Sequence, residues 1–106
     1  MEKVPTYHIF TTDEFEKAFH KLDHSLQEQV RKKIADLEIN PFAGKPLGTA
    51  FFRERKVRHL RIYYLIYESV VAVFVIALSD KKTQQETIDA IKNSLPRYQE
   101  QLKKSL

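Results

Sequence analysis

The 106-residue sequence has no cysteine, no tryptophan and only two glycines. The absence of cysteine excludes disulfides, thiolate chemistry and cysteine-ligated zinc. The two glycines, Gly44 and Gly48, are too few for the glycine-rich loops that cradle nucleotides, and the motif that carries a nucleophilic serine is also absent. The longest apolar run, residues 70–78, is much shorter than the ~18–20 residues of a membrane-spanning helix, so we expect no membrane partner.

Length and composition predict one domain over residues 1–106. Hydrophobic residues make up 42% of the chain, enough to form a core, and the 30% of charged residues favours solubility. The first ten residues, MEKVPTYHIF, contain no apolar segment typical of a secretory signal. We therefore expect a cytoplasmic protein.

The positive charge is concentrated in one segment. Residues 51–61, FFRERKVRHLR, hold five arginines and lysines and a single glutamate, which accounts for the whole net charge of +4. This concentration indicates an anionic partner, either nucleic acid or an acidic protein segment, and a merely solvated strand face is the alternative. The candidate phosphate-binding residues of the segment are Arg53, Arg55, Lys56, Arg58 and Arg61.

The N-terminal part predicts a short strand followed by a helical hairpin. Residues 7–10 are β-prone, and apolar residues then recur at helical spacing over residues 12–22 and again from Leu26 to Leu37. Pro41 ends the second helix because proline cannot continue the hydrogen-bond ladder. Three capping boxes mark the expected helix starts: Thr11 with Glu14, Ser25 with Glu28, and Thr83 with Glu86.

The middle of the chain predicts strands. Residues 41–49 contain both glycines and two prolines and form the one obvious loop. Residues 51–67 are too long for one ordinary strand, so we expect a bend within residues 57–61 and a strand over residues 63–67. Residues 70–78 have no polar face, which predicts a central strand covered on both sides.

A C-terminal helical extension is expected over about residues 83–105, with an interruption at Pro96 and with Tyr98 and Leu102 facing inward. The predicted order is therefore β-α-α-β-β-β-α. Because the helices are segregated from a run of neighbouring strands, the fold class is α+β, with an antiparallel-rich sheet of about four strands.

The basic segment carries residue types that suit RNA cleavage. Transfer of a 2′-OH onto the adjacent phosphate needs a proton acceptor, a proton donor and cations against the developing negative charge. Arginine binds two phosphate oxygens with its planar fork. If side chains alternate between the two faces along the whole segment, the odd positions from Arg53 to Arg61 share one strand face and Lys56 and Arg58 lie on the other. The bend expected within residues 57–61 would mix these faces.

Histidine is the side chain that changes charge near neutral pH, so His59 is the candidate general base; binding phosphate or packing on Tyr63 is the alternative. Tyr63, Tyr64 and Tyr67 are candidates for base stacking, or else for the core. His20 and His24 lie four residues apart without a completing carboxylate, so we expect no metal and no cofactor.

The sequence resembles the RelE/ParE toxin superfamily. The resemblance covers about residues 7–82 and rests on the element order, the loop NPFAGKPL, and the run RKVRHLRIYYLIYE followed by an apolar strand. It implies a small toxin restrained by an antitoxin with an acidic, amphipathic segment. RelE-like members cleave mRNA in the ribosomal A site, whereas ParE-like members share the fold and act on DNA gyrase.

The resemblance to RelE-like members also implies residue roles, without a metal ion. Tyr64 stands where their pattern has an arginine, so Arg58 or Arg61 would substitute. Lys81 and Lys82 would replace the cation after the last strand, where this chain has no tyrosine. The expected catalytic set is Arg58, His59, Arg61 and Lys82, and the expected nucleic-acid-binding set is Arg53, Arg55, Lys56 and Lys81.

The leading hypothesis is thus a divergent RelE-like toxin that acts on mRNA and the ribosome. A ParE-like toxin without nuclease activity, or a decayed toxin that only binds an antitoxin, are the alternatives. The C-terminal helix is expected either to cover part of the sheet or to form a homodimer.

Overall fold

The computed structural model describes residues 6–106; the first five residues of the segment considered for a secretory signal lie outside this part. The described residues form five strands, four α-helices and two short 3-10 turns. In chain order these are β1 (His8–Thr11), α1 (Asp13–His20), α2 (His24–Ile39), η1 (Pro41–Ala43), β2 (Lys45–Pro46), β3 (Phe52–Val57), β4 (Leu60–Tyr67), η2 (Glu68–Val70), β5 (Ala72–Asp80), α3 (Gln84–Lys92) and α4 (Leu95–Ser105).

The strands form one mixed sheet in the order β1-β5-β4-β3-β2. β1 runs parallel to β5, and the other neighbours are antiparallel. β5 therefore lies inside the sheet, as its apolar sequence predicts. The α+β class is confirmed, but the strand count is five, because Lys45 and Pro46 of the predicted loop pair with Glu54 and Arg53 as β2.

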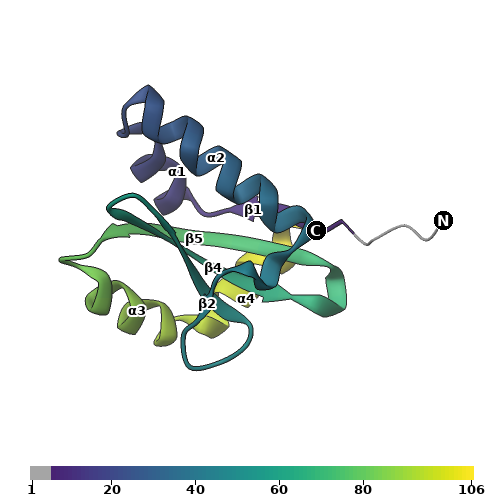
Figure 1. Ribbon diagram of the computed structural model, residues 1–106. Coiled ribbons are helices and arrows are strands. Elements are labelled where there is room, and N and C mark those ends of the chain that lie inside the picture. Colours follow the sequence, from purple (N-terminus) through teal and green to yellow (C-terminus); the bar gives the residue numbers. More distant parts are fainter. Residues whose placement is uncertain (1–5) are drawn as a thin grey trace.

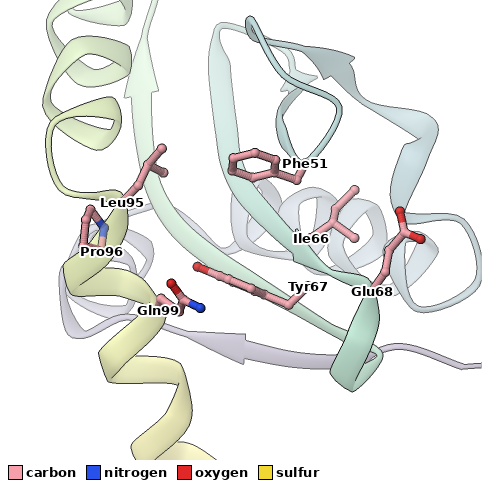
Figure 2. A pocket seen from close by; sticks show the side chains of 7 residues that line it. All are labelled: Phe51, Ile66, Tyr67, Glu68, Leu95, Pro96 and Gln99. Carbon is pink, nitrogen blue, oxygen red and sulfur yellow. The ribbon is translucent and has the colours of Figure 1, made fainter.

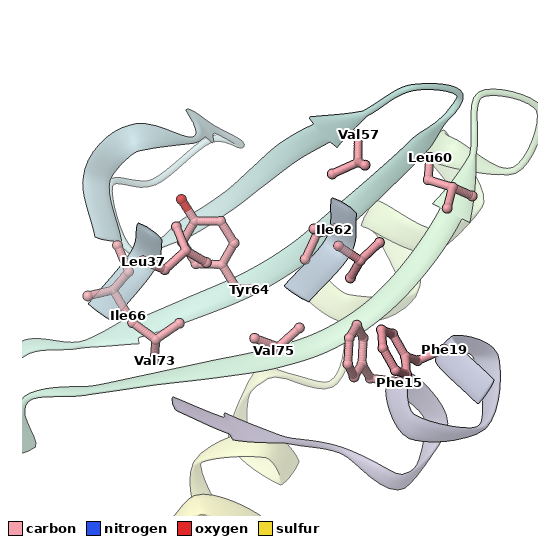
Figure 3. Packing of buried hydrophobic residues seen from close by; sticks show 11 residues of the cluster. Phe15, Phe19, Leu37, Val57, Leu60, Ile62, Tyr64, Ile66, Val73 and Val75 are labelled. Carbon is pink, nitrogen blue, oxygen red and sulfur yellow. The ribbon is translucent and has the colours of Figure 1, made fainter. Parts of the chain in front are cut away.

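Helices cover both faces of the sheet (Figure 1). The hairpin α1–α2 packs on one face, where Phe15 and Leu37 meet Tyr64 and Val75 in a buried cluster (Figure 3). α3 and α4 pack on the other face, where Ile91, Tyr98 and Leu102 meet Phe74. The extension predicted over about residues 83–105 is thus two helices that cover the sheet.

None of the three predicted capping boxes forms as predicted, although the third lies at the right position. The hydroxyl of Thr12, not of Thr11, accepts the N–H of Phe15 at 3.0 Å, and it donates to the carbonyl of Ile76 in β5 at 2.6 Å. Asp23, not Ser25, caps α2 by accepting the N–H of Leu26 at 2.8 Å. Thr83 stands at the N-cap position of α3, as predicted, but its side chain makes no capping hydrogen bond. Several nearby residues can cap a helix, and the contact with β5 selects Thr12.

The expected bend in residues 57–61 is the two-residue turn Arg58-His59 between β3 and β4. The connection from β4 to β5 is longer than the two residues left between the strands predicted over residues 63–67 and 70–78. Val70 belongs to η2, and Val71 follows in the left-handed region with φ 51°. β5 consequently starts at Ala72 rather than at residue 70.

A buried tyrosine fastens the loop between α2 and β3. The hydroxyl of Tyr64 donates to the carbonyl of Pro41 at 2.7 Å and accepts the N–H of Gly44 at 3.0 Å. A β-carbon at Gly44 would collide with this hydroxyl and with the carbonyl oxygen of Glu54, so the approach requires glycine. The hydroxyl of Tyr64 in β4 therefore holds the loop against the sheet.

Replacing Tyr64 with phenylalanine keeps the buried ring but leaves the Gly44 N–H and the Pro41 carbonyl without their partner. We expect the free energy of unfolding to fall by about 2 kcal/mol, measured by urea denaturation. Tyr98→Phe is the control, because its hydroxyl only accepts a contact from the exposed Arg97 at 3.3 Å. Equal stability of the Tyr64→Phe variant and the original chain would contradict this role.

Candidate functional site

One end of the sheet carries a shallow hollow of about 360 Å³ in which cations predominate. We call it the basic hollow. It is lined by Lys56, Arg58, His59, Arg61, Asp80, Lys81 and Lys82. Five cations thus face a single carboxylate. All four predicted catalytic residues lie here, together with Lys56 and Lys81 of the predicted binding set.

Strand register assembles the basic hollow from two turns. Because β3 and β4 are joined by only two residues, Lys56 lies directly opposite Arg61 on the same face of the sheet. Leu60 pairs in turn with Asp80 at the end of β5. The β3–β4 turn and the segment after β5 therefore meet at one end of the sheet (Figure 1), which brings Lys81 and Lys82 beside Arg58 and His59.

Arg58 occupies a strained position in this turn. Its φ is 54°, in the left-handed region that favours glycine at the first central position of a two-residue hairpin turn. Its Nε donates to Oε1 of Gln29 in α2 at 3.0 Å. An exposed arginine thus stands where the backbone alone would favour glycine, and α2 supports its side chain.

Asp80 closes the second turn. Its carboxylate accepts the backbone N–H of Thr83 at 3.0 Å and the Thr83 hydroxyl at 3.2 Å. The Thr83 N–H, above all, lowers the pKa of Asp80, with further help from Lys82. The carboxylate therefore holds the turn at neutral pH, a contribution lost only as the pH falls through the lowered pKa. The turn leaves Lys81 and Lys82 exposed.

Arg53 and Arg55 of the predicted binding set lie on the opposite face, where Arg53 contacts the loop between α2 and β3 and Arg55 contacts α2. Arg53 donates to the carbonyls of Ala50 at 2.7 Å and Gly44 at 2.7 Å, and its guanidinium lies 5.0 Å from the ring centre of Phe42. Arg55 lies 3.4 Å from the carboxylate of Asp36. The predicted grouping of odd positions therefore ends at the turn: Arg61 faces the same side as Lys56, away from Arg53 and Arg55.

The tyrosines of β4 belong mainly to the core. Tyr63 and Tyr64 have no exposed surface, so neither ring is available to stack on a base. Burial raises the pKa of both phenols, and it raises the pKa of the half-buried Tyr67 to about 12. Tyr64, in the place of the arginine of the RelE pattern, therefore contributes no cation and instead holds the loop.

A buried polar cluster borders the basic hollow, and sequence reasoning missed it. Glu54, 8% exposed, accepts both of its hydrogen bonds from the amide of Gln84, at 3.1 and 3.0 Å. The hydroxyl of Tyr63 contacts that of Ser79 at 2.8 Å. The alternation of β3 places Glu54 on the same face as Lys56, but no sequence pattern indicated Ser79 or Gln84.

A second, apolar pocket of about 430 Å³ lies between β4 and the start of α4. Figure 2 shows Tyr67 directed toward Leu95, Pro96 and Gln99 of α4, with Phe51 and Ile66 beside it. Phe51 is 41% exposed. This pocket offers apolar contact surface, in contrast to the basic hollow.

Within residues 6–106, no three histidine, aspartate or glutamate side chains come together as metal ligands. In the same range, no helix is long and apolar enough to span a bilayer.

A family model described as the ParE toxin of the type II toxin–antitoxin system parDE matches residues 9–85. The chain belongs to this toxin family. It is therefore a type II toxin of the RelE/ParE superfamily, and the resemblance seen in the sequence is confirmed. No curated protein sequence matches the chain significantly.

Solved structures similar to this toxin include RelE proteins. The Escherichia coli toxin RelE in the free state, with two arginines replaced by alanine, has a TM-score of 0.71 at 25% identity, covering 83% of this chain and 97% of RelE. RelE in the intact E. coli RelBE toxin–antitoxin complex has a TM-score of 0.63 at 27% identity, with coverages of 70% and 95%. The Mycobacterium tuberculosis RelBE2 complex has a TM-score of 0.65 at 22% identity, with coverages of 76% and 98%, and supports the fold alone.

Glycine at position 58 should relieve the backbone strain that Arg58 carries. We expect Arg58→Gly to unfold at an equal or higher temperature, with a gain of up to about 1 kcal/mol after loss of the Gln29 contact. Calorimetry measures the change. His59→Gly in the same turn is the control and should destabilise, because His59 is not in the left-handed region. A clear loss of stability in Arg58→Gly would contradict the strain.

Proposed function

We propose that this toxin inhibits translation by cleaving mRNA in a ribosome-dependent reaction at the basic hollow. The observation that carries the proposal is the meeting of Arg58, His59, Arg61 and Lys82 around one open, phosphate-accessible space. Exposed cations bind phosphate, and a histidine beside them can accept a proton at neutral pH. The proposed place of action is the cytoplasm.

The proposed reaction is a transesterification without a metal ion. His59 takes the proton of the 2′-OH while the 2′-oxygen forms a bond to the adjacent phosphorus. The bond from phosphorus to the 5′-oxygen breaks, and that oxygen takes up a proton, leaving a 2′,3′-cyclic phosphate and a 5′-OH. Arg58 and Arg61 stabilise the charge on the phosphorus oxygens, and Lys82 donates to the 5′-oxygen. Lys56 and Lys81 bind the flanking phosphates.

We also propose an antitoxin partner with an acidic, amphipathic segment. The similar RelBE structures are toxin–antitoxin complexes, which supports such a partner. The basic hollow would attract its carboxylates, and the apolar pocket beside Tyr67 would receive apolar side chains. A homodimer through α4 stays a prediction: Tyr98 and Leu102 are already buried against the sheet, so it would use the polar outer face of the helix.

A ParE-like action on DNA gyrase is the second candidate. Two observations favour it: the matched family is described as ParE, and Tyr64 replaces the arginine of the RelE pattern with a buried phenol. In that case the basic hollow binds the target without cutting RNA.

The first test expresses the toxin in cells and maps mRNA ends. We expect growth arrest with new ends inside translated codons, reduced at least 100-fold in Arg58→Ala/Arg61→Ala, because both cations on the transition state are lost. The matched control is Lys103→Gln/Lys104→Gln, which removes two exposed charges on α4. Arrest with DNA breaks at gyrase sites and no new mRNA ends would identify the gyrase target instead.

The second test addresses His59. Removing a general base typically lowers a rate by about 10²–10⁴-fold, so we expect His59→Ala to slow single-turnover cleavage on programmed ribosomes within that range. Binding, measured separately, should change by less than threefold. An unchanged cleavage rate would exclude His59 as the base while leaving the basic hollow as the binding site.

A further inference from the structure

A second polar surface lies beside the basic hollow, on α2. Gln29, Lys32, Lys33 and Asp36 recur at helical spacing and therefore share one face of this helix. With Ala35 they line a hollow of about 500 Å³. Lys32 is exposed, Lys33 is half-buried, and both line this open hollow. We call this surface the α2 ridge.

Two side-chain contacts join the α2 ridge to the β3–β4 hairpin. Arg58, which also lines the basic hollow, donates from Nε to Oε1 of Gln29 at 3.0 Å. Arg55 places Nη2 3.4 Å from Oδ2 of Asp36, and its Nη1 is buried without a hydrogen-bond partner. Arg58 is thus shared by the two surfaces, and cationic groups continue from the end of the sheet onto the helix.

The charge of the α2 ridge favours a polyanion. Together, Lys32, Lys33, Arg55 and Arg58 bring four cations against the single carboxylate of Asp36. That carboxylate is already engaged by Arg55, which leaves the two lysines for another partner. Closely spaced lysines attract a phosphate backbone through charge and the release of counterions.

The residues that line the α2 ridge indicate which kind of polyanion it would bind. Ala35 supplies the only apolar side chain, so an amphipathic protein segment would find no pocket for an anchor. No aromatic ring lines the surface, so the unstacked bases of a single strand would find no platform. A double-stranded RNA backbone needs neither, because proteins recognise it mainly by shape and phosphate contacts.

We propose that the α2 ridge is a second RNA-binding surface, on which Lys32 and Lys33 bind the backbone of an RNA duplex while the basic hollow holds the strand to be cut. The choice of RNA rests on the proposed function. The ridge acts in binding only, so it raises the affinity for a structured RNA target without taking part in proton transfer.

The test measures binding of the toxin to a fluorescently labelled RNA hairpin as the salt concentration is varied. Lys32→Gln/Lys33→Gln removes two charges but keeps long, helix-favouring side chains. We expect affinity about 10-fold lower at ~100 mM salt, and a plot of log K against log salt whose slope is shallower by about 2. Lys103→Gln/Lys104→Gln, the same change on α4, should match the original toxin.

Three outcomes would overturn the proposal that the α2 ridge binds RNA. The first is an unchanged RNA affinity of the Lys32→Gln/Lys33→Gln variant, and the second is an equal loss of RNA affinity in the α4 control. The third is a Lys32→Gln/Lys33→Gln variant that keeps its RNA affinity but loses affinity for an acidic peptide, which would indicate a protein partner. Thermal unfolding of each variant shows whether it is folded, and Lys32→Gln alone, at the more exposed position, repeats the test if the double variant is unstable.

A cleavage assay on ribosomes distinguishes failure of the α2 ridge proposal from failure of the proposed function. If both hold, Lys32→Gln/Lys33→Gln raises KM about 10-fold and leaves the rate at saturation unchanged. If the original toxin binds the hairpin through the two lysines but never cleaves mRNA, the proposed function fails and the ridge stands. If it cleaves and the lysine variants keep their KM, the ridge alone fails.

Discussion

The two-residue turn between β3 and β4 is the constraint on which the candidate site depends. A connection this short leaves one register for the hairpin, and side chains on paired strands then face each other in fixed pairs. Lys56 meets Arg61, and Leu60 meets Asp80 across the next pair. A slip by one residue would move Lys56 and Arg61 into the face that α1 and α2 cover. The register is therefore required both by the core and by the cluster of cations.

The same constraint divides the basic segment between the two faces of the sheet. A run of cations in one strand cannot all serve one surface, because successive side chains point to opposite faces. Arg53 and Arg55 face α2 and the loop, where backbone carbonyls and Asp36 engage them. Lys56, Arg58 and Arg61 stay open to a ligand. Part of the positive charge that is conspicuous in the sequence, on Arg53 and Arg55, therefore stabilises the packing of the loop and α2 on the sheet.

Tyr64 shows how one residue separates this toxin from the RelE pattern. Where that pattern carries a cation, the phenol of Tyr64 is buried and bonded to the loop at Pro41 and Gly44. The proposed chemistry consequently moves to the turn and to the segment after β5, where Asp80 orders the backbone that presents Lys81 and Lys82. The α2 ridge would extend this shifted surface, since Arg58 belongs to both.

The sequence by itself determined the class of fold, the place of the bend and the order of the elements apart from β2 and the division of the C-terminal extension into two helices. Apolar periodicity and proline positions act over a few residues, so a local pattern is enough to predict them. The sequence also located the basic segment and, through the resemblance, the toxin family. Only the tertiary structure decided which threonine caps α1, that Lys45 and Pro46 form a strand, and on which face each cation lies. Those choices depend on partners far along the chain: Ile76 for Thr12, Glu54 for Lys45, and Gln29 for Arg58. A local pattern contains no information about such partners, because they become neighbours only when the sheet has formed.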